Sequence, residues 1–226
     1  MSTTIDAAEP RTALVLDGRT DDGLTLALIH EALVDSLAAG GWAVDDWRLR
    51  DDTIAWCAGC FKCWTTTPGV CAHHDDGREV AARWVRSDLV VLLTPVTFGG
   101  YSSELKKALD HVIPILLPTM LHRGGETHHP QRYDRRRDLL FVGTVSAGQA
   151  EGPEARTFRR LVERNTLNME PPRWACGVLE EGAGEWEVRV AVDALLAKVG
   201  APLARDMVGA RPARDAVGSG REGAVA

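Results

Sequence analysis

The sequence lacks the features that point to a membrane or to nucleic acid. No apolar run approaches the roughly 20 residues that a membrane-spanning helix needs. Basic residues number 26 against 32 acidic ones, a formal net charge of -6, so the chain lacks the basic face of a nucleic-acid-binding protein. The first ten residues, MSTTIDAAEP, lack the basic start and apolar core of a signal peptide. We therefore expect a cytoplasmic protein with a small-molecule partner and no nucleic-acid or membrane partner.

Internal repeats are also absent, and the chain length limits the domain organisation. With 226 residues, 45% of them hydrophobic, the chain can bury one substantial core. We expect one domain over residues 12–200, after a flexible lead-in at 1–11 and before a mobile tail at 201–226. Residues 114–138 are predicted to be an insertion within that domain. Its apolar start at 115–117 is expected to form an interface between subunits, because exposed apolar patches seldom stay uncovered.

Short apolar runs alternate with amphipathic segments along the chain. The runs are typical of strands that are buried on both faces of a parallel sheet, and they lie at 13–16, 42–49, 89–93, 139–145 and 174–179. Helical spacing of apolar residues follows each of them. Asp75 and Asp76 are predicted to cap the helix that ends near Ser87, and Ser102 or Ser103 to cap the helix after the third strand. The pattern predicts an α/β fold with a doubly wound, five-stranded parallel sheet.

Three loops of this predicted fold follow strands at the same edge of the sheet. Parallel sheets of this kind bind ligands beyond the carboxyl ends of their strands. The loops span residues 17–25, 95–101 and 144–148, and we expect them to converge. The first runs from a strand into a helix and contains two glycines, Gly18 and Gly23, an arrangement that favours anion binding.

Cysteines are few, and four of the five lie in one stretch, CAGCFKCWTTTPGVC, as Cys57, Cys60, Cys63 and Cys71. Four thiolates at this spacing can hold a [4Fe–4S] cluster. They can also form a tetrahedral zinc site, with His73 and His74 as substitute ligands. A third possibility is metal-free thiols that lie near a redox cofactor or at an oligomer contact, and a fourth is buried structural cysteine.

The order of four motifs resembles that of a known family. The motifs are G-x-x-x-x-G-x-T in the first loop, CxGCxxCW with PGxC, TPVxFGxYSxxLKxxLD, and HHxxRY. They are similar to those of the flavodoxin-like NAD(P)H-dependent oxidoreductases, which include FMN reductases and iron–sulfur flavoproteins. The resemblance covers residues 12–200. It implies a flavodoxin-like sheet of strand order 2-1-3-4-5, FMN at the strand ends, and a homodimer or homotetramer.

The resemblance also implies the residues that contact FMN. The first loop would hold the phosphate, the second would follow the ribityl chain and the ring edge, and the third would border the pyrimidine end. Phe98 or Tyr101 would stack on the ring. The implied cofactor-binding residues are Gly18, Arg19, Thr20, Gly23, Thr25, Pro95, Val96, Thr97, Phe98, Gly99, Tyr101, Thr144, Ser146 and Gly148. Cys57, Cys60, Cys63 and Cys71 would hold the cluster of an iron–sulfur flavoprotein.

The function implied is an FMN-dependent NAD(P)H oxidoreductase that passes hydride or electrons from a nicotinamide to an unidentified small-molecule or protein acceptor. Catalytic acids or bases are not expected, since the chemistry takes place on the flavin. One alternative is an iron–sulfur flavoprotein for single-electron transfer. Another is a non-enzymatic binding protein of the same fold that has lost FMN, because Asp17, Asp21 and Asp22 place three carboxylates near the expected phosphate.

Overall fold

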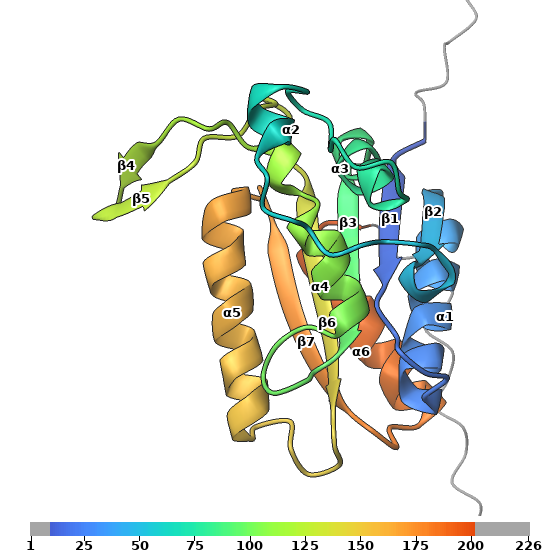
Figure 1. The fold of residues 1–226 in the computed structure, drawn as a ribbon. Helices are drawn as coiled ribbons and strands as arrows, with labels where there is room; N and C mark the ends of the chain where they lie inside the picture. Colours follow the sequence, from blue (N-terminus) through green and yellow to red (C-terminus); the bar gives the residue numbers. More distant parts are fainter. Residues whose placement is uncertain (1–9, 202–226) are drawn as a thin grey trace, which may run out of the picture.

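The structure is a computed structural model that describes residues 10–201. The expected lead-in at 1–11 and tail at 201–226 therefore lie almost wholly outside the described residues. Five parallel strands form the main sheet, in the order β2-β1-β3-β6-β7 (Figure 1). They are β1 (Thr12–Asp17), β2 (Ala43–Arg48), β3 (Leu89–Pro95), β6 (Asp138–Val145) and β7 (Trp174–Glu180). The predicted α/β class and five-stranded parallel sheet are confirmed.

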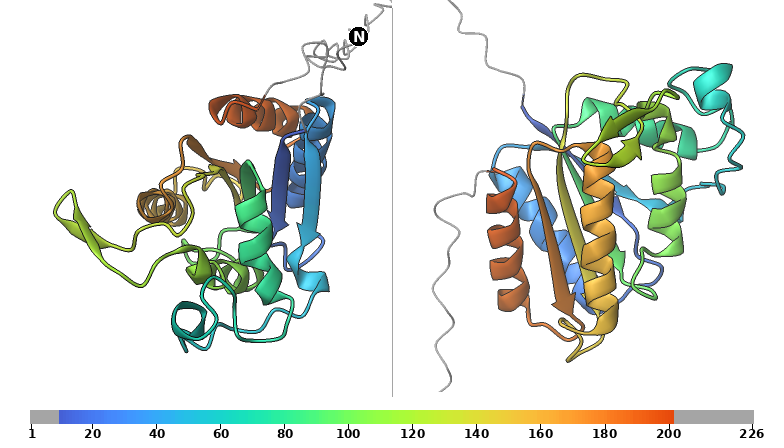
Figure 2. Two further views of the ribbon diagram at one scale, coloured as in Figure 1. Left: turned by 90° about the horizontal axis from the view of Figure 1, so that it is seen from above. Right: turned by 90° about the vertical axis from the view of Figure 1, so that its left-hand side faces the viewer.

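Helices cover both faces of this sheet (Figure 2). On one face lie α1 (Leu24–Ala39) and α6 (Glu185–Lys198), which pack against each other. On the other lie α3 (Gly77–Arg86), α4 (Ser103–Asp110) and α5 (Pro153–Met169). The buried apolar side chains accordingly form two core clusters, one on each face. This double burial explains why the central strands are continuous apolar runs: every residue of β6 is buried.

Of the helix caps predicted from the sequence, the one on α4 is confirmed and the one on α3 is not. Ser102 caps α4 as predicted, because its Oγ accepts a hydrogen bond from the Leu105 N–H at 3.2 Å. The prediction that Asp75 and Asp76 cap α3 is wrong, since α3 has no side-chain cap. Their carboxylates instead accept hydrogen bonds from the N–H groups of Ala55 and Thr53, at 3.0 and 2.8 Å. They bind the start of the cysteine loop to the start of α3.

The insertion predicted at 114–138 contains a short 3-10 helix, η2 (Ile113–Ile115), and a hairpin of β4 (Leu121–Arg123) and β5 (Glu126–His128). Ile115 is only 5% exposed and belongs to the core, and Leu116 packs against that core. The segment folds back, so that the Arg132 N–H donates to the Ile115 carbonyl at 2.7 Å. Ile115 is therefore covered by its own chain, whereas Leu116 and Leu117 are only partly buried, and a subunit interface at 115–117 stays a prediction.

The hairpin projects from the body of the molecule beside the C-terminal half of α5 (Figure 2). It is held there by polar contacts. Arg164 of α5 donates two hydrogen bonds to Glu126, and Arg123 contacts Glu170 and the carbonyl of Leu167. His128 lies 3.0 Å from the side-chain oxygen of Asn168. The hairpin thus contacts α5 and is not part of the main sheet.

Among residues 10–201, no helix has both the length and the apolar character that crossing a lipid bilayer requires.

Candidate functional site

The three loops at the carboxyl ends of the strands lie side by side, as predicted. The Gly18 N–H donates to the Leu93 carbonyl at 2.8 Å, and the Ser102 Oγ donates to the Gly18 carbonyl at 2.6 Å. The Val96 N–H in turn donates to the Thr144 carbonyl at 2.9 Å. A Cβ at Gly18 would lie 2.6 Å from that of Leu105 and 2.9 Å from the Leu93 oxygen. Only glycine allows the first loop to lie this close to its neighbours.

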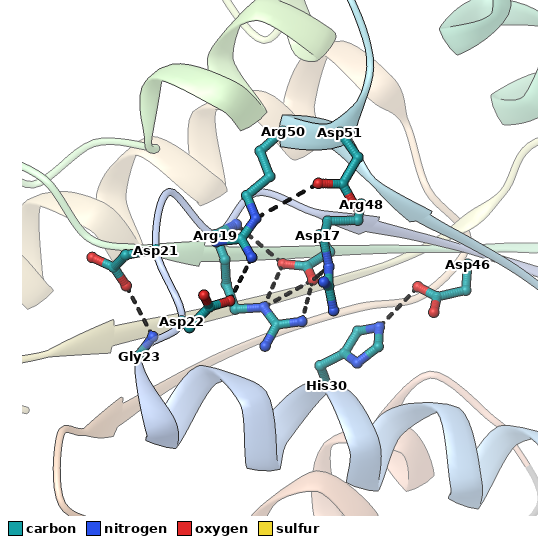
Figure 3. A network of polar contacts seen from close by, with 10 residues as sticks. All are labelled: Asp17, Arg19, Asp21, Asp22, Gly23, His30, Asp46, Arg48, Arg50 and Asp51. Carbon is teal, nitrogen blue, oxygen red and sulfur yellow. Dashed lines mark hydrogen bonds and ion pairs between the residues drawn. The ribbon is translucent and has the colours of Figure 1, made fainter.

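A buried ion pair organises the first loop (Figure 3). Asp17, at the end of β1, is fully buried, and Arg19 is only 5% exposed. The Arg19 guanidinium donates to both carboxylate oxygens of Asp17, with Nη2 at 2.6 Å from Oδ2, and the Arg19 N–H donates to Oδ1 at 3.0 Å. Arg48, from β2, lies 3.7 Å from the same carboxylate. Arg19 is therefore turned inward as the counter-ion of Asp17.

The two exposed aspartates of this loop also have partners. Asp22 pairs with Arg50, which follows β2, and the hydrogen bond from Arg50 holds the pKa of Asp22 below its usual value. The Oδ1 of Asp21 accepts a hydrogen bond from the Gly23 N–H at 2.9 Å. Arg19 in the loop itself and Arg48 and Arg50, at and just after the end of β2, thus offset the charges of Asp17 and Asp22, which had suggested that the loop repels a phosphate.

The N-terminus of α1 directly follows the first loop and is uncapped. The helix has no side-chain cap and no acidic residue in its first turn. Thr25 is 2% exposed, and its hydroxyl oxygen accepts a hydrogen bond from the Gly182 N–H at 3.0 Å, so it points into the protein. Leu24, the first helical residue, is 73% exposed. The positive end of the helix dipole and its first N–H groups are therefore left for an external anion.

The second loop presents an aromatic ring on a tight turn. The N–H and carbonyl groups of Thr97 and Gly100 hydrogen-bond each other, and the two residues between them have positive φ, +51° at Phe98 and +76° at Gly99. Such a turn favours Asn or Gly, so a phenylalanine there is strained. The Phe98 side chain is 92% exposed. Backbone strain combined with an exposed ring is typical of functional loops.

Tyr101, the other ring considered for stacking, faces the protein instead. It lies 6.4 Å from the ring of Phe141 and meets the edge of Phe158 at 5.6 Å. The Asn165 side chain donates to its hydroxyl at 2.8 Å, and burial raises the pKa of Tyr101 well above its usual value. Tyr101 lines a groove of about 420 Å³ between α4 and α5. Phe98 is thus the only one of the two whose ring is available at the strand ends.

The third loop is held by one carboxylate. The Gly148 N–H and the Ala150 N–H donate to the two oxygens of Glu180, at 2.9 and 2.8 Å. Thr144 is buried within β6, whereas Ser146 is exposed. Gly148 has a φ of +74° and open space around its Cβ position. Glu180, at the end of β7, therefore sets the shape of the loop that borders the site.

The cysteine loop lies elsewhere. It contains α2 (Lys62–Thr65), whose Trp64 donates from Nε1 to the Ile113 carbonyl at 3.1 Å, just beyond the C-terminal end of α4. The loops of the site lie at the N-terminal end of α4 (Figure 1). Cys63, within α2, therefore lies at the opposite end of α4 from the three loops of the candidate site.

The four thiols are neighbours but do not form a metal site here. Burial raises the pKa of the Cys63 thiol, and the proximity of Cys71, Cys57 and Cys60 raises it further. Within residues 10–201, however, no three His, Cys, Asp or Glu side chains are arranged to hold a metal ion. The donor types suit a [4Fe–4S] cluster or zinc, but their positions do not.

Comparison with known families decides the assignment. Residues 12–164 match the model of the NADPH-dependent FMN reductases, a region that spans more than half of the chain. The protein belongs to the NADPH-dependent FMN reductase family. The resemblance derived from the sequence motifs is thereby confirmed.

Relatives of this family member include iron–sulfur flavoproteins of archaea. One from Methanocaldococcus jannaschii is 33% identical over 106 residues, which cover 46% of this chain and 53% of the relative. One from Archaeoglobus fulgidus is 25% identical over 139 residues, covering 62% of this chain and 60% of the relative. The matched regions thus span little more than half of these relatives.

Solved structures with the same fold share little sequence with this FMN reductase family member. An NAD(P)H:quinone oxidoreductase from Methanothermobacter marburgensis superposes with a TM-score of 0.62 at 13% identity, over 84% of this chain and 96% of that one. An azoreductase from Bacillus anthracis superposes with a TM-score of 0.61 at 11% identity, over 84% and 98%. These similarities establish the flavodoxin-like fold.

Sequence reasoning missed the arginines beside the first loop of the candidate site. Arg48 and Arg50 lie at and just after the end of β2, and both reach the first loop. The strand order could have predicted them: β2 is the neighbour of β1, so the carboxyl end of β2 lies beside the first loop.

The pKa of Glu180 leads to a prediction for the third loop. Hydrogen bonds from the N–H groups of Ala150 and Gly148 hold this pKa below its ordinary value of 4.5. Because the pKa is lowered by folding, the stabilisation is complete above pH 4.5 and is lost as the pH falls through the folded-state pKa. Hydrogen-exchange protection of these two amides should therefore fall in acid, before the sheet unfolds.

Glu180→Gln is the matched variant, since it keeps a hydrogen-bond acceptor and removes the titration. Protection of the Gly148 and Ala150 amides in Glu180→Gln should be lower than in the wild type at neutral pH, because one uncharged oxygen replaces two, and should not change across this pH range. Equal acid-dependent loss of protection in the wild type and in Glu180→Gln would show that another group controls the loop.

Proposed function

We propose that this protein is an FMN-dependent oxidoreductase that oxidises NADPH or NADH and reduces a second substrate. The observation that carries the proposal is the open N-terminus of α1, which lies at the same edge of the sheet as the exposed ring of Phe98. A phosphate binder and an aromatic platform at the ends of parallel strands suit a flavin mononucleotide. Membership of the FMN reductase family supports this reading.

The first loop supplies the phosphate contacts in this proposal. Backbone N–H groups of Thr20 and of the first turn of α1 would donate to the phosphate, as helix N-termini do in other phosphate sites, while the Gly23 N–H keeps its bond to Asp21. Thr20 adds an exposed hydroxyl. Arg19 acts indirectly, by neutralising Asp17 under the loop, whereas Arg48 and Arg50 contribute positive charge from β2. The arginines thus neutralise the aspartates of the first loop in the protein without bound FMN.

The second and third loops orient the ring. Residues 95–99 would follow the ribityl chain, and Phe98 would stack on the isoalloxazine. Open space at Gly148 leaves its backbone accessible, and Glu180 holds that loop rigid. When bound, FMN supplies hydride acceptance from the nicotinamide and electron delivery to the acceptor. The protein's residues bind and orient both substrates, and none is proposed as an acid or base.

A small planar molecule is the acceptor class that we favour. Solved proteins of the same fold carry the names quinone oxidoreductase and azoreductase, and Phe98 leaves the site open to solvent. An iron–sulfur flavoprotein, as the archaeal relatives are named, is the second candidate because four thiols lie in one loop. The positions of those thiols do not favour it.

Anaerobic mixing of the FMN-loaded protein with NADPH, and separately with NADH, tests the proposal. Bleaching of the flavin absorption, followed by its recovery when a quinone or an azo dye is added, is the expected result. A flavin that stays oxidised with excess of both nicotinamides would overturn the proposed activity. An iron assay on the same sample decides the iron–sulfur alternative, which requires about four iron atoms per chain.

A further inference from the structure

Arg137 is a buried cation without an ion-pair partner among residues 10–201. It directly precedes β6, at the end of the sheet opposite to the candidate site, and is only 8% exposed. Within the described part of the chain, its guanidinium donates only to backbone carbonyls, those of Arg135 and of Val85 in α3. The Arg137 Nε–H is buried without an acceptor. A buried charge without a counter-ion is costly, so this arrangement favours binding of an anion.

Carboxylates around Arg137 already bind other arginines. These pairs are Asp88 with Arg135, Asp138 with Arg173, and Glu170 with Arg123 and Arg136. Asp134, three residues before Arg137, is exposed, so solvent screens its charge. Burial lowers the pKa of Arg137, and Arg135 and Arg136 lower it further, each with a larger effect than the opposing one of Asp88. The described part of the chain therefore does not neutralise the Arg137 guanidinium.

A small cavity adjoins the Arg137 side chain. Its volume is about 10 Å³, which is room for one water molecule or one ion of similar size. The polar side chains that line it can all donate hydrogen bonds, and none is a carboxylate: they are Gln131, Tyr133, Arg136 and Arg137. The Gln131 amide uses one N–H on the Asn168 carbonyl, at 2.6 Å, and keeps a second. The lining therefore suits an acceptor that carries negative charge.

We propose that this cavity binds a monatomic anion of the size of chloride, which accepts the Arg137 Nε–H bond and neutralises the guanidinium. A phosphate or a carboxylate group is too large for the cavity. A water molecule would accept the hydrogen bond but would leave the charge uncompensated. The end of α3, the end of the insertion and the start of β6 meet at Arg137, so the anion would hold these three segments together.

Chloride-35 nuclear magnetic resonance on the whole chain tests the proposal, because exchange of chloride with a protein site broadens the resonance of free chloride. The wild type should broaden it, and added sodium bromide should reverse the broadening by displacing chloride. Arg137→Gln should lose the broadening. Arg135→Gln is the matched control and should keep it, since Arg135 is exposed and pairs with Asp88. No broadening by the wild type, or equal broadening by the wild type and Arg137→Gln, would overturn the proposal.

Bromide in crystals of the wild type keeps the test decisive even if Arg137→Gln folds poorly. Bromide scatters X-rays anomalously, so its position can be told from that of a water molecule. Crystals soaked in sodium bromide should show an anomalous peak beside the Arg137 Nε, in contact with the Gln131 amide or the Tyr133 ring. Anomalous peaks only elsewhere, such as at the N-terminus of α1, or a water molecule beside the Arg137 Nε, would overturn the proposal.

Discussion

Replacement of Asp17 by asparagine is expected to lower the free energy of unfolding by about 3–5 kcal/mol. Asp17 is fully buried and Arg19 is 5% exposed, so Asp17→Asn leaves a guanidinium buried without its counter-ion. Arg48 adds to the imbalance, since it lies 3.7 Å from the same carboxylate. Urea denaturation at neutral pH, followed by far-ultraviolet circular dichroism, measures the loss.

Two variants separate this buried pair from the exposed charges of the same loop. Asp22→Asn removes the exposed partner of Arg50 and should change stability little, because solvent screens exposed pairs. Asp17→Leu combined with Arg19→Met removes both buried charges and should recover much of the loss, since the desolvation cost disappears with them. Unchanged stability of Asp17→Asn would show that the pair does not organise the loop.

Replacement of Leu24 by glutamate is expected to weaken FMN binding by about 10- to 100-fold, because it places a carboxylate near the proposed phosphate position. Leu24 is the first residue of α1 and is 73% exposed, so the new side chain fits without repacking. An acidic residue in the first turn stabilises the helix. Weaker binding together with unchanged or higher stability therefore cannot be attributed to unfolding. Quenching of FMN fluorescence measures the dissociation constant.

The control for this prediction is Leu24→Gln, which has nearly the shape of the glutamate variant without its charge. Its FMN affinity should stay within a few-fold of the wild type. Riboflavin, which lacks the phosphate, should bind Leu24→Glu and Leu24→Gln equally. If the two variants bind FMN equally well, the phosphate does not bind at the N-terminus of α1.

The sheet and the position of the site could be predicted because each depends on a local pattern. β1, β3 and β6 are buried on both faces, so their apolar runs mark them directly. Once the strands are parallel, the loops that follow β1, β3 and β6 must meet at one edge. Hydrogen bonds from Gly18 to Leu93 and from Val96 to Thr144 confirm this meeting.

The direction of individual side chains could not be predicted in the same way. Arg19 occupies a position expected to contact phosphate. It faces Asp17 instead, because folding buries that carboxylate away from solvent. Tyr101 follows Phe98 by three residues, and only the core contacts with Phe141 and Phe158 decide that it turns inward. Both outcomes depend on partners that lie on other elements or become buried only on folding.

The cysteine spacing predicted that the four thiols lie near one another, but it could not predict where the cysteine loop lies in the fold. Burial raises the pKa of the Cys63 thiol, and the neighbouring Cys71, Cys57 and Cys60 raise it further, so the thiols do lie near one another. Their placement depends on the contact of Trp64 with Ile113, which are 49 residues apart in the sequence. The pairing of residues 115–117 with residues 130–132 could not be predicted for a similar reason, since it joins segments that lie apart in the sequence.

Titration of the flavin-free protein with FMN tests the central claim most directly. The account predicts saturable binding of one FMN per chain, with quenched flavin fluorescence and resolved flavin absorption bands, because Phe98 stacks on the ring while α1 holds the phosphate. Flavin spectra that stay those of free FMN at every protein concentration would contradict it.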